Sequence, residues 1–168
     1  MPQSILAIDK PQIQEVKIKK EIFMPTLFEL DGFLAENEIE CFQAKELVHG
    51  LKNGNTVPPK ELWKNILPTL KLAELARKDL HTRVKITSGY RNEHYNAKPN
   101  IGGSKNSFHI YFRALDCKPL DCPLVDFLDY ILEHLNNPID CNSWGIKEYN
   151  TFLHIDDRKN RYRNLYRV

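Results

Sequence analysis

RVKITSGYR, residues 83–91, is the stretch of sequence that decides the fold. Its first five residues alternate polar and apolar side chains, and the apolar ones, Val84 and Ile86, are β-branched. This pattern predicts a strand with one buried face, and Ser88-Gly89 predicts its end. Tyr90 and Arg91 therefore lie directly after the end of the predicted strand.

Three further strands are predicted on the C-terminal side of the first one. A loop rich in Asn, Gly and Ser covers residues 96–107, and a short strand is expected around 114–117, before Pro119. Two apolar stretches, 144–146 and 152–155, are expected to pair as strands. The predicted sheet is therefore small and antiparallel.

Helices are predicted mainly before the first strand. Apolar residues recur at three- and four-residue steps over 36–51 and again over about 59–80, where Pro68 predicts a kink or a division into two helices. A third helix is expected from Pro123 to about residue 135. Its predicted inward side chains are Val125, Leu128, Ile131, Leu132 and Leu135. Helices followed by strands with irregular connections indicate an α+β fold, in which a small antiparallel sheet packs with several helices.

The composition is that of an ordinary soluble domain: of 168 residues, 42% are hydrophobic and 27% are charged. The formal charge of +2 is too even to suggest a nucleic-acid partner. No apolar run is long enough for a membrane span, and the first 12 residues lack the apolar stretch of a signal peptide. We expect one domain over residues 26–168, preceded by an N-terminal arm, residues 1–25, that is disordered or docks on a partner.

The four cysteines, Cys41, Cys117, Cys122 and Cys141, are expected to be reduced and partly buried. A domain of this size without a signal peptide is a poor case for a disulfide framework. A zinc site built from thiolates is the alternative, but the sequence contains no C-x2-C pair.

Two histidines and one aspartate form the candidate for a metal site: His109, Asp116 and His154. This is a ligand set of catalytic zinc, in which three protein ligands leave the fourth position to a water that the metal acidifies toward a pKa near 7. Taken alone, each residue has an ordinary alternative, a hydrogen-bonded histidine or an aspartate in a turn. Their surroundings decide between these interpretations.

Motifs of unrelated residue types follow one another in a fixed order around these three residues. They are Ser88-Gly89-Tyr90-Arg91, Asn96, Gly102-Gly103, Ser107-x-His109, Ala114-x-Asp116, Gly145-Ile146 and His154-x-Asp156. This order resembles the zinc D-alanyl-D-alanine carboxypeptidase family, which shares a superfamily with the lysostaphin-type peptidases and the hedgehog signalling domain. The resemblance covers about residues 26–160 and implies that His109, Asp116 and His154 bind Zn²⁺.

Four residues near the metal have expected roles, three of them implied by the resemblance and that of Asp156 by its spacing from His154. Arg91 would project into the cleft and hold a substrate carboxylate or the developing oxyanion, which suits the planar donor fork of a guanidinium; a surface salt bridge is the alternative. Ser107 would bond a metal ligand or the substrate, and Tyr149 would be a cleft aromatic, with a turn residue and core packing as their alternatives. Asp156 would share a strand face with His154 and orient it, unless it forms a surface ion pair.

The sequence departs from the family pattern at two positions. Phe112 stands three residues after the first histidine, where many relatives have Gly, and a bulky ring there implies a shifted loop or a partly filled cleft. Thr151 stands where relatives of the carboxypeptidase type carry the acidic general base. Glu148 is the nearest upstream carboxylate and could act as the catalytic base only if Tyr149-Asn150 turns the chain back. The Phe-x-His-x-Asp ending without that acid favours an endopeptidase-like branch.

Two functions follow from these observations. The first is a zinc metallopeptidase that hydrolyses peptidoglycan stem peptides or cross-links. The second is a catalytically inactive, zinc-containing module that binds the cell wall or has a structural role. Without a signal peptide, a wall substrate suggests a phage-encoded endolysin or virion-associated enzyme, which is cytoplasmic until released or is carried in the virion. Residues 1–25 would then be a candidate for docking to phage tail proteins.

Overall fold

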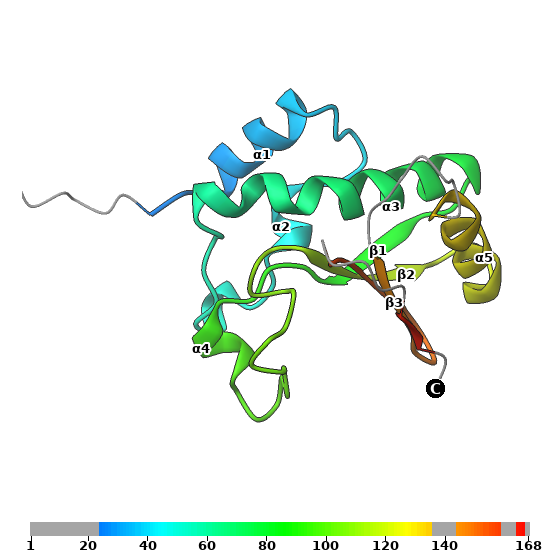
Figure 1. Ribbon diagram of the computed structural model, residues 1–168. Helices are drawn as coiled ribbons and strands as arrows, with labels where there is room; N and C mark the ends of the chain where they lie inside the picture. Colours follow the sequence, from blue (N-terminus) through cyan, green and yellow to red (C-terminus); the bar gives the residue numbers. More distant parts are fainter. Residues whose placement is uncertain (1–23, 136–143, 159–163, 167–168) are drawn as a thin grey trace, which may run out of the picture.

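Helices cover one face of a small sheet in the computed structural model, which confirms the predicted α+β fold (Figure 1). The structure describes residues 24–135, 144–158 and 164–166. The predicted N-terminal arm, residues 1–25, lies almost wholly outside the described residues, so its docking to phage tail proteins stays a prediction.

The sheet has five strands in the order β1-β2-β4-β3-β5. Their bounds are β1 Val84–Ser88, β2 Ala114–Pro119, β3 Trp144–Glu148, β4 Leu153–Asp157 and β5 Asn164–Tyr166. The first four strands pair antiparallel, as predicted from the sequence. The sequence does not predict β5, which has three residues and pairs parallel with β3.

The register between β2 and β4 separates a core face of the sheet from a polar face. Leu115 lies opposite Ile155 and Cys117 lies opposite Leu153, and all four side chains are buried in the core. Asp116 and His154 form the pair between them. Because successive residues of a strand point to opposite faces, Asp116 and His154 share the face that is turned away from the core.

The core face packs against two helices, α3 (Leu67–Asp79) and α5 (Leu124–Leu135). The predicted division at Pro68 is confirmed, because a 3₁₀ helix, Lys60–Ile66, runs into α3 and Pro68 occupies the first turn of α3. Helix α5 buries Leu128, Ile131 and Leu135 as predicted and keeps Leu132 partly buried. The prediction for Val125 is wrong. Its side chain is exposed in the first turn, and Phe127 takes the inward position instead.

The predicted helix over residues 36–51 is also wrong. The structure has α1 (Leu27–Glu36) before this segment and only the short α2 (Ala44–Leu47) within it. Asn37 caps the C-terminal end of helix α1, and Glu38 has a positive φ of 64°. The backbone N–H groups of Glu40 and Cys41 then donate to the buried Glu74 carboxylate, so they make no helical bonds. The apolar residues of the segment Ile39, Phe42, Leu47 and Val48 are buried nevertheless, so their spacing reports core packing without a helix.

Phe112 lies in the core and does not fill a cleft, contrary to the expectation from the sequence. Its φ is 52°, which is the backbone conformation that favours the Gly of relatives at this position. Its ring is fully buried and packs edge-on against Tyr90, with 5.8 Å between the ring centroids. Phe112 thus has a backbone conformation typical of glycine, and its ring is part of the hydrophobic core.

Replacing Phe112 with alanine is expected to lower the free energy of unfolding by about 3–5 kcal/mol, the usual range for deleting a buried Phe. For a chain of this size the melting temperature should fall by roughly 6–20 °C. Phe112→Gly should be more stable than Phe112→Ala by about 1 kcal/mol, because only Gly takes a positive φ without strain. Thermal melting by circular dichroism measures both values. The exposed Tyr111 provides the control, and Tyr111→Ala should melt like the wild type.

Candidate metal centre

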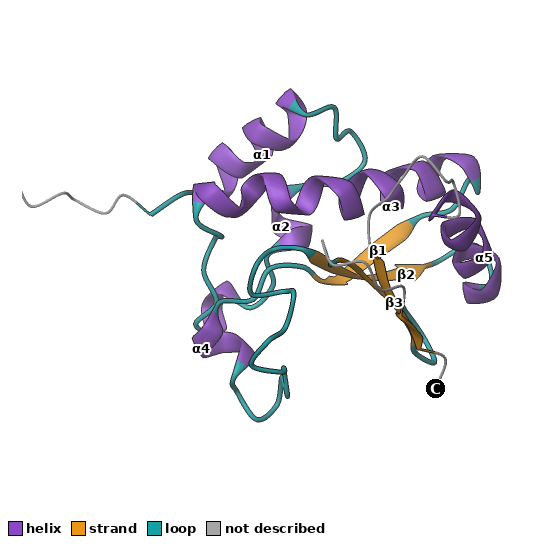
Figure 2. Cartoon of the chain, viewed as in Figure 1, coloured by secondary structure: helices purple, strands orange, loops and turns teal. Residues whose placement is uncertain are grey.

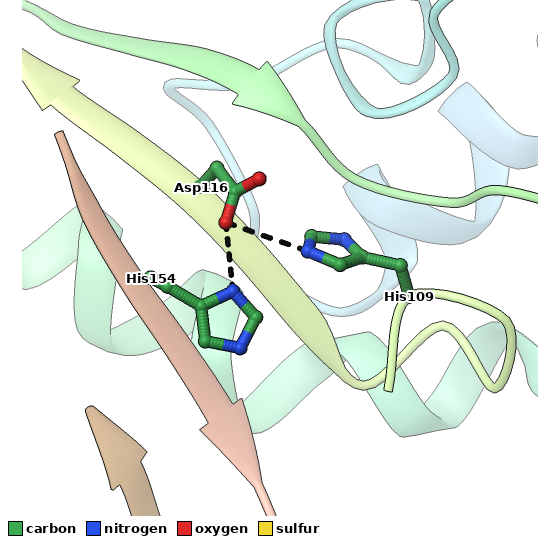
Figure 3. A group of neighbouring side chains, drawn as sticks. All are labelled: His109, Asp116 and His154. Atoms are coloured by element: carbon green, nitrogen blue, oxygen red, sulfur yellow. Dashed lines mark hydrogen bonds and ion pairs between the residues drawn. The ribbon is translucent and has the colours of Figure 1, made fainter. Parts of the chain in front are cut away.

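The three predicted metal ligands meet on the polar face of the sheet, although they come from three segments (Figure 3). Asp116 projects from β2 and His154 from its partner strand β4, whereas His109 comes from the long loop between α4 (Glu93–Asn96) and β2. Figure 2 shows that loop in teal, extending beyond the edge of the sheet. One possible ligand atom from each residue lies within 4.8 Å of the others.

Hydrogen bonds fix which atom of each histidine faces the centre. Nδ1 of His109 lies 2.6 Å from the carbonyl oxygen of Gly89, so it carries the proton and leaves Nε2 directed at Asp116, 3.4 Å from Oδ1. His154 has the opposite orientation. Its Nε2 lies 3.0 Å from Asp156 Oδ2, and its Nδ1 lies 2.7 Å from Asp116 Oδ1. The three inward atoms are therefore His109 Nε2, Asp116 Oδ1 and His154 Nδ1.

Gly89 is needed for the position of His109. A Cβ at this residue would lie 2.3 Å from the backbone oxygen of Leu47, so a side chain would push the end of β1 away from α2. The next residue, Tyr90, donates its N–H to that same oxygen at 2.8 Å. This close backbone contact places the Gly89 carbonyl where it accepts from His109.

The charges at the centre are set by burial and by the hydrogen bonds between its members. Burial is the largest effect on Asp116 and opposes ionisation, but its close contacts with the two histidines hold its pKa well below the usual range. Burial lowers the pKa of His109 and keeps this ring neutral. Burial also lowers the pKa of His154, but its hydrogen bonds to Asp116 and Asp156 outweigh this effect and raise the pKa to about 9. Asp116 and His109 are thus ready to bind a cation, and a metal at His154 replaces one proton.

The centre fits a zinc ion. Nε2 of His109 is buried and has no hydrogen-bond partner within the described residues, which is a costly state for a polar atom. Two imidazole nitrogens and one carboxylate oxygen are ordinary ligands of Zn²⁺, and three protein ligands are typical of catalytic sites. None of the described cysteines belongs to the group, and Cys41, Cys117 and Cys122 are free thiols.

A cleft of about 520 Å³ opens directly over the three ligands. It is lined by the three ligands and by Arg91, Ile101, Gly102, Gly103, Ser104, Asn106, Ser107, Phe108, Tyr149, Phe152, Asp156 and Arg158. The structure therefore brings together four residues whose roles were predicted from the sequence, namely Arg91, Ser107, Tyr149 and Asp156.

Arg91 points into this cleft and is not a surface residue. Only 14% of its side chain is exposed, and its guanidinium lies 3.6 Å from Asp116 Oδ2 and 3.5 Å from Asn96 Oδ1. Burial lowers the pKa of the guanidinium, and the negative charge of Asp116 opposes this effect. Nε of Arg91 has no hydrogen-bond partner in the part of the chain that is described. Long contacts and an unpaired donor leave the guanidinium able to bind a further anionic group.

The other predicted residues occupy the rim and the base of the cleft. Asp156 is fully buried beside His154, and hydrogen bonds from His154 and Arg158 lower its pKa although burial opposes this. Tyr149 is exposed and stacks on Phe152, with 4.4 Å between the ring centroids. Ser107 lines the cleft two residues before His109. The surroundings of Tyr149 therefore differ from a packed core.

Glu148 is not brought to the centre, although the chain does turn back after it. Tyr149 N–H bonds to Phe152 O, and the resulting hairpin pairs Glu148 with Leu153. Residues paired across antiparallel strands share a face, so Glu148 shares the face of the buried Leu153, whereas Lys147 shares that of His154. Glu148 does not line the cleft.

Phe108, Phe152 and Arg158 are among the residues of the cleft wall for which sequence reasoning gave no role. Phe108 and Phe152 precede a histidine ligand by one and two residues, a position that places them beside the metal centre. Arg158 follows Asp156 by two residues, so the i, i+2 spacing of a strand could have indicated a pair.

Three possible metal ligands beneath an open cleft are the arrangement found in metal-dependent hydrolases, a class in which three protein ligands leave one coordination position open. The model of one family, described as Peptidase M15, matches residues 34–156, which is more than half of the chain. The chain belongs to this family of zinc D-alanyl-D-alanine carboxypeptidase-like peptidases, as its motifs led us to expect. At the level of the family, membership supports a peptidase with peptidoglycan as substrate. No curated protein matches the sequence significantly.

Within the described residues, no helix is both long and apolar enough to cross a membrane.

Proposed function

We propose that this protein is a zinc metallopeptidase that hydrolyses peptide bonds in the stem peptides or cross-links of peptidoglycan. The observation that carries the proposal is the convergence of His109 Nε2, Asp116 Oδ1 and His154 Nδ1 beneath an open cleft of about 520 Å³. A cleft of this size accommodates several residues of a peptide, and the ligand set leaves one coordination position for chemistry.

Each residue of the cleft has a role in this proposal. When bound, zinc acidifies water toward a pKa near 7 and polarises a peptide carbonyl. Arg91 donates its planar fork to the oxygen on which negative charge develops, or to a carboxylate of the substrate. Ser107 and Tyr149 contact the peptide from the rim. Asp156 accepts from Nε2 of His154 and so keeps Nδ1 directed at the metal.

One observation favours the second candidate, a zinc-containing wall-binding or structural module without turnover. Among the described residues that line the cleft, the carboxylates are Asp116 and Asp156, and hydrogen bonds occupy both. The cleft therefore offers no third carboxylate in the described residues to serve as general base. Metal content does not separate the two functions, but turnover does.

The experiment that tests the proposal is digestion of purified peptidoglycan and of soluble stem-peptide fragments. We expect new peptide termini, seen by mass spectrometry, which disappear after treatment with a chelator and return when zinc is added. The masses of the products identify the bond that is cut. Binding of the zinc-loaded protein to peptidoglycan without any new termini would establish the module in place of the enzyme.

A further inference from the structure

Asp156 is the most buried charge beside the metal centre, and Arg158 neutralises it. The side chain of Asp156 is 0% exposed. Its Oδ1 accepts from Nε of Arg158 at 2.7 Å, and its Oδ2 accepts from an Nη of the same guanidinium at 3.0 Å. This two-point contact fixes the plane of the carboxylate as well as its position. A carboxylate without exposure is costly to bury unless it has such a partner.

The same carboxylate determines the orientation of His154. Oδ2 of Asp156 also lies 3.0 Å from Nε2 of His154, on the side of the ring opposite Asp116. With Nε2–H donating to Asp156, the free lone pair of the neutral ring is at Nδ1, which faces the centre. A chain of contacts thus runs from Arg158 through Asp156 to His154.

Two features hold Arg158 in place. The guanidinium lies over the ring of Phe108, at 5.3 Å from its centroid, and Phe108 precedes the ligand His109. Gly145 lies opposite Asp156 on β3 and leaves the space that the guanidinium needs. A Cβ at Gly145 would lie 2.1 Å from Nε of Arg158 and 2.5 Å from Oδ2 of Asp156.

We propose that Arg158 is a positioning residue that strengthens zinc binding by holding Asp156 against His154, with Gly145 providing the space for this contact. The proposal rests on the zinc site of the proposed function, but not on peptidase turnover. Arg158 contacts no ligand atom in the structure. Its effect therefore reaches the metal through Asp156 and the ring of His154.

Arg158→Met tests the proposal, since methionine keeps much of the apolar stem and removes the donors. In a competition titration with a chromophoric zinc chelator, the Kd of the variant for zinc should rise by up to about 10- to 100-fold, the usual effect of losing the outer partner of a metal-bound histidine, which here is Asp156. Arg158→Lys keeps the positive charge but loses the planar pair of donors, so its Kd for zinc should lie between those of the wild type and Arg158→Met. The visible spectrum of bound cobalt(II) should change in Arg158→Met, because it reports ligand geometry.

Gly145→Ala displaces the guanidinium without removing a charge, and it should also weaken zinc binding. Arg113→Met is the matched control, because Arg113 forms a similarly buried pair with Asp157, 3.4 Å away on the other face of β4. Circular dichroism verifies that each variant is folded. Arg113→Met should keep the wild-type Kd even if its stability falls.

A double-mutant cycle separates action through Asp156 from a general effect on the fold. In an Asp156→Asn background, adding Arg158→Met should raise the Kd little further, because the contact that transmits its effect is already lost. A wild-type Kd in both Arg158→Met and Gly145→Ala, or full additivity in the cycle, would overturn the proposal. Wild-type protein that binds no zinc would instead reject the zinc site itself.

Discussion

His109→Ala is expected to abolish the response of this protein to zinc. In the wild type, zinc at about 100 times its Kd should stabilise the fold by about 2.7 kcal/mol and raise the melting temperature by roughly 5–10 °C. The variant should bind less than one zinc per chain and should melt at the same temperature with and without added metal. Peptidoglycan turnover should fall by at least about 10³-fold, because the metal supplies several kcal/mol of transition-state stabilisation.

The structure gives a specific reason for this expectation at His109. Its Nε2 is a buried polar atom without a hydrogen-bond partner among the described residues, so the substitution removes a ligand atom that is free to bind metal, together with the bond from Nδ1 to the Gly89 carbonyl oxygen. His154→Ala should release the metal too, but it also breaks the bonds to Asp116 and Asp156, so its own stability should fall. Elemental analysis and melting curves measure these effects.

The exposed His134 of α5 provides the control for both histidines. His134→Ala should retain one zinc per chain and the wild-type shift in melting temperature. If His109→Ala and His154→Ala also retained their zinc, these residues would not be ligands and the candidate metal centre would be rejected.

The candidate metal centre was predictable because its three residues belong to short motifs that can be recognised in the sequence. Asp116 and His154 lie 38 positions apart, yet each was identified within its own strand, and the register later placed them opposite each other. The sequence also indicated which side chains are buried. Ile39 and Phe42 have the spacing of a helix and are buried, although the segment that holds them is mostly not helical.

The sequence does not show which groups far apart in the chain form hydrogen bonds with each other. The helix over 36–51 was overestimated because Glu74 binds the backbone N–H groups of Glu40 and Cys41, a contact between segments that are more than 30 positions apart. Helix α1 was not predicted, although Thr26 and Glu29, which form its capping box, are a local signal for its start. Local signals therefore identify elements, whereas long-range contacts decide where they end.

Phe112 shows the same limit at a single position. A ring at a glycine position suggested a narrowed cleft, but a positive φ turns this side chain toward the core, where Tyr90 receives it. At Glu148 the hairpin does turn back as expected, but the pairing with Leu153 places the carboxylate on the face of the sheet opposite to that of His154. In both cases the sequence identified the position, and the direction of the side chain depended on the backbone and the register.

Arg91→Lys is expected to keep the zinc and to lower turnover by roughly 10- to 1000-fold. Lysine preserves the positive charge near Asp116, but it cannot present the planar pair of donors that matches an oxyanion or a carboxylate. The guanidinium is only 14% exposed, and its contacts to Asp116 and Asn96 are long, at 3.6 and 3.5 Å, so they leave it able to bind a further group. Turnover of stem-peptide fragments at saturating and limiting substrate separates an effect on kcat from one on KM. A fall in kcat indicates that Arg91 binds the oxyanion, and a rise in KM alone indicates that it binds a carboxylate of the substrate in the ground state.

Arg83→Lys is the matched control, because Arg83 forms its ion pair with Asp121 at the surface. Wild-type rates in Arg91→Lys would show that the guanidinium does not act on the substrate. Loss of zinc from this variant would show instead that the guanidinium supports Asp116.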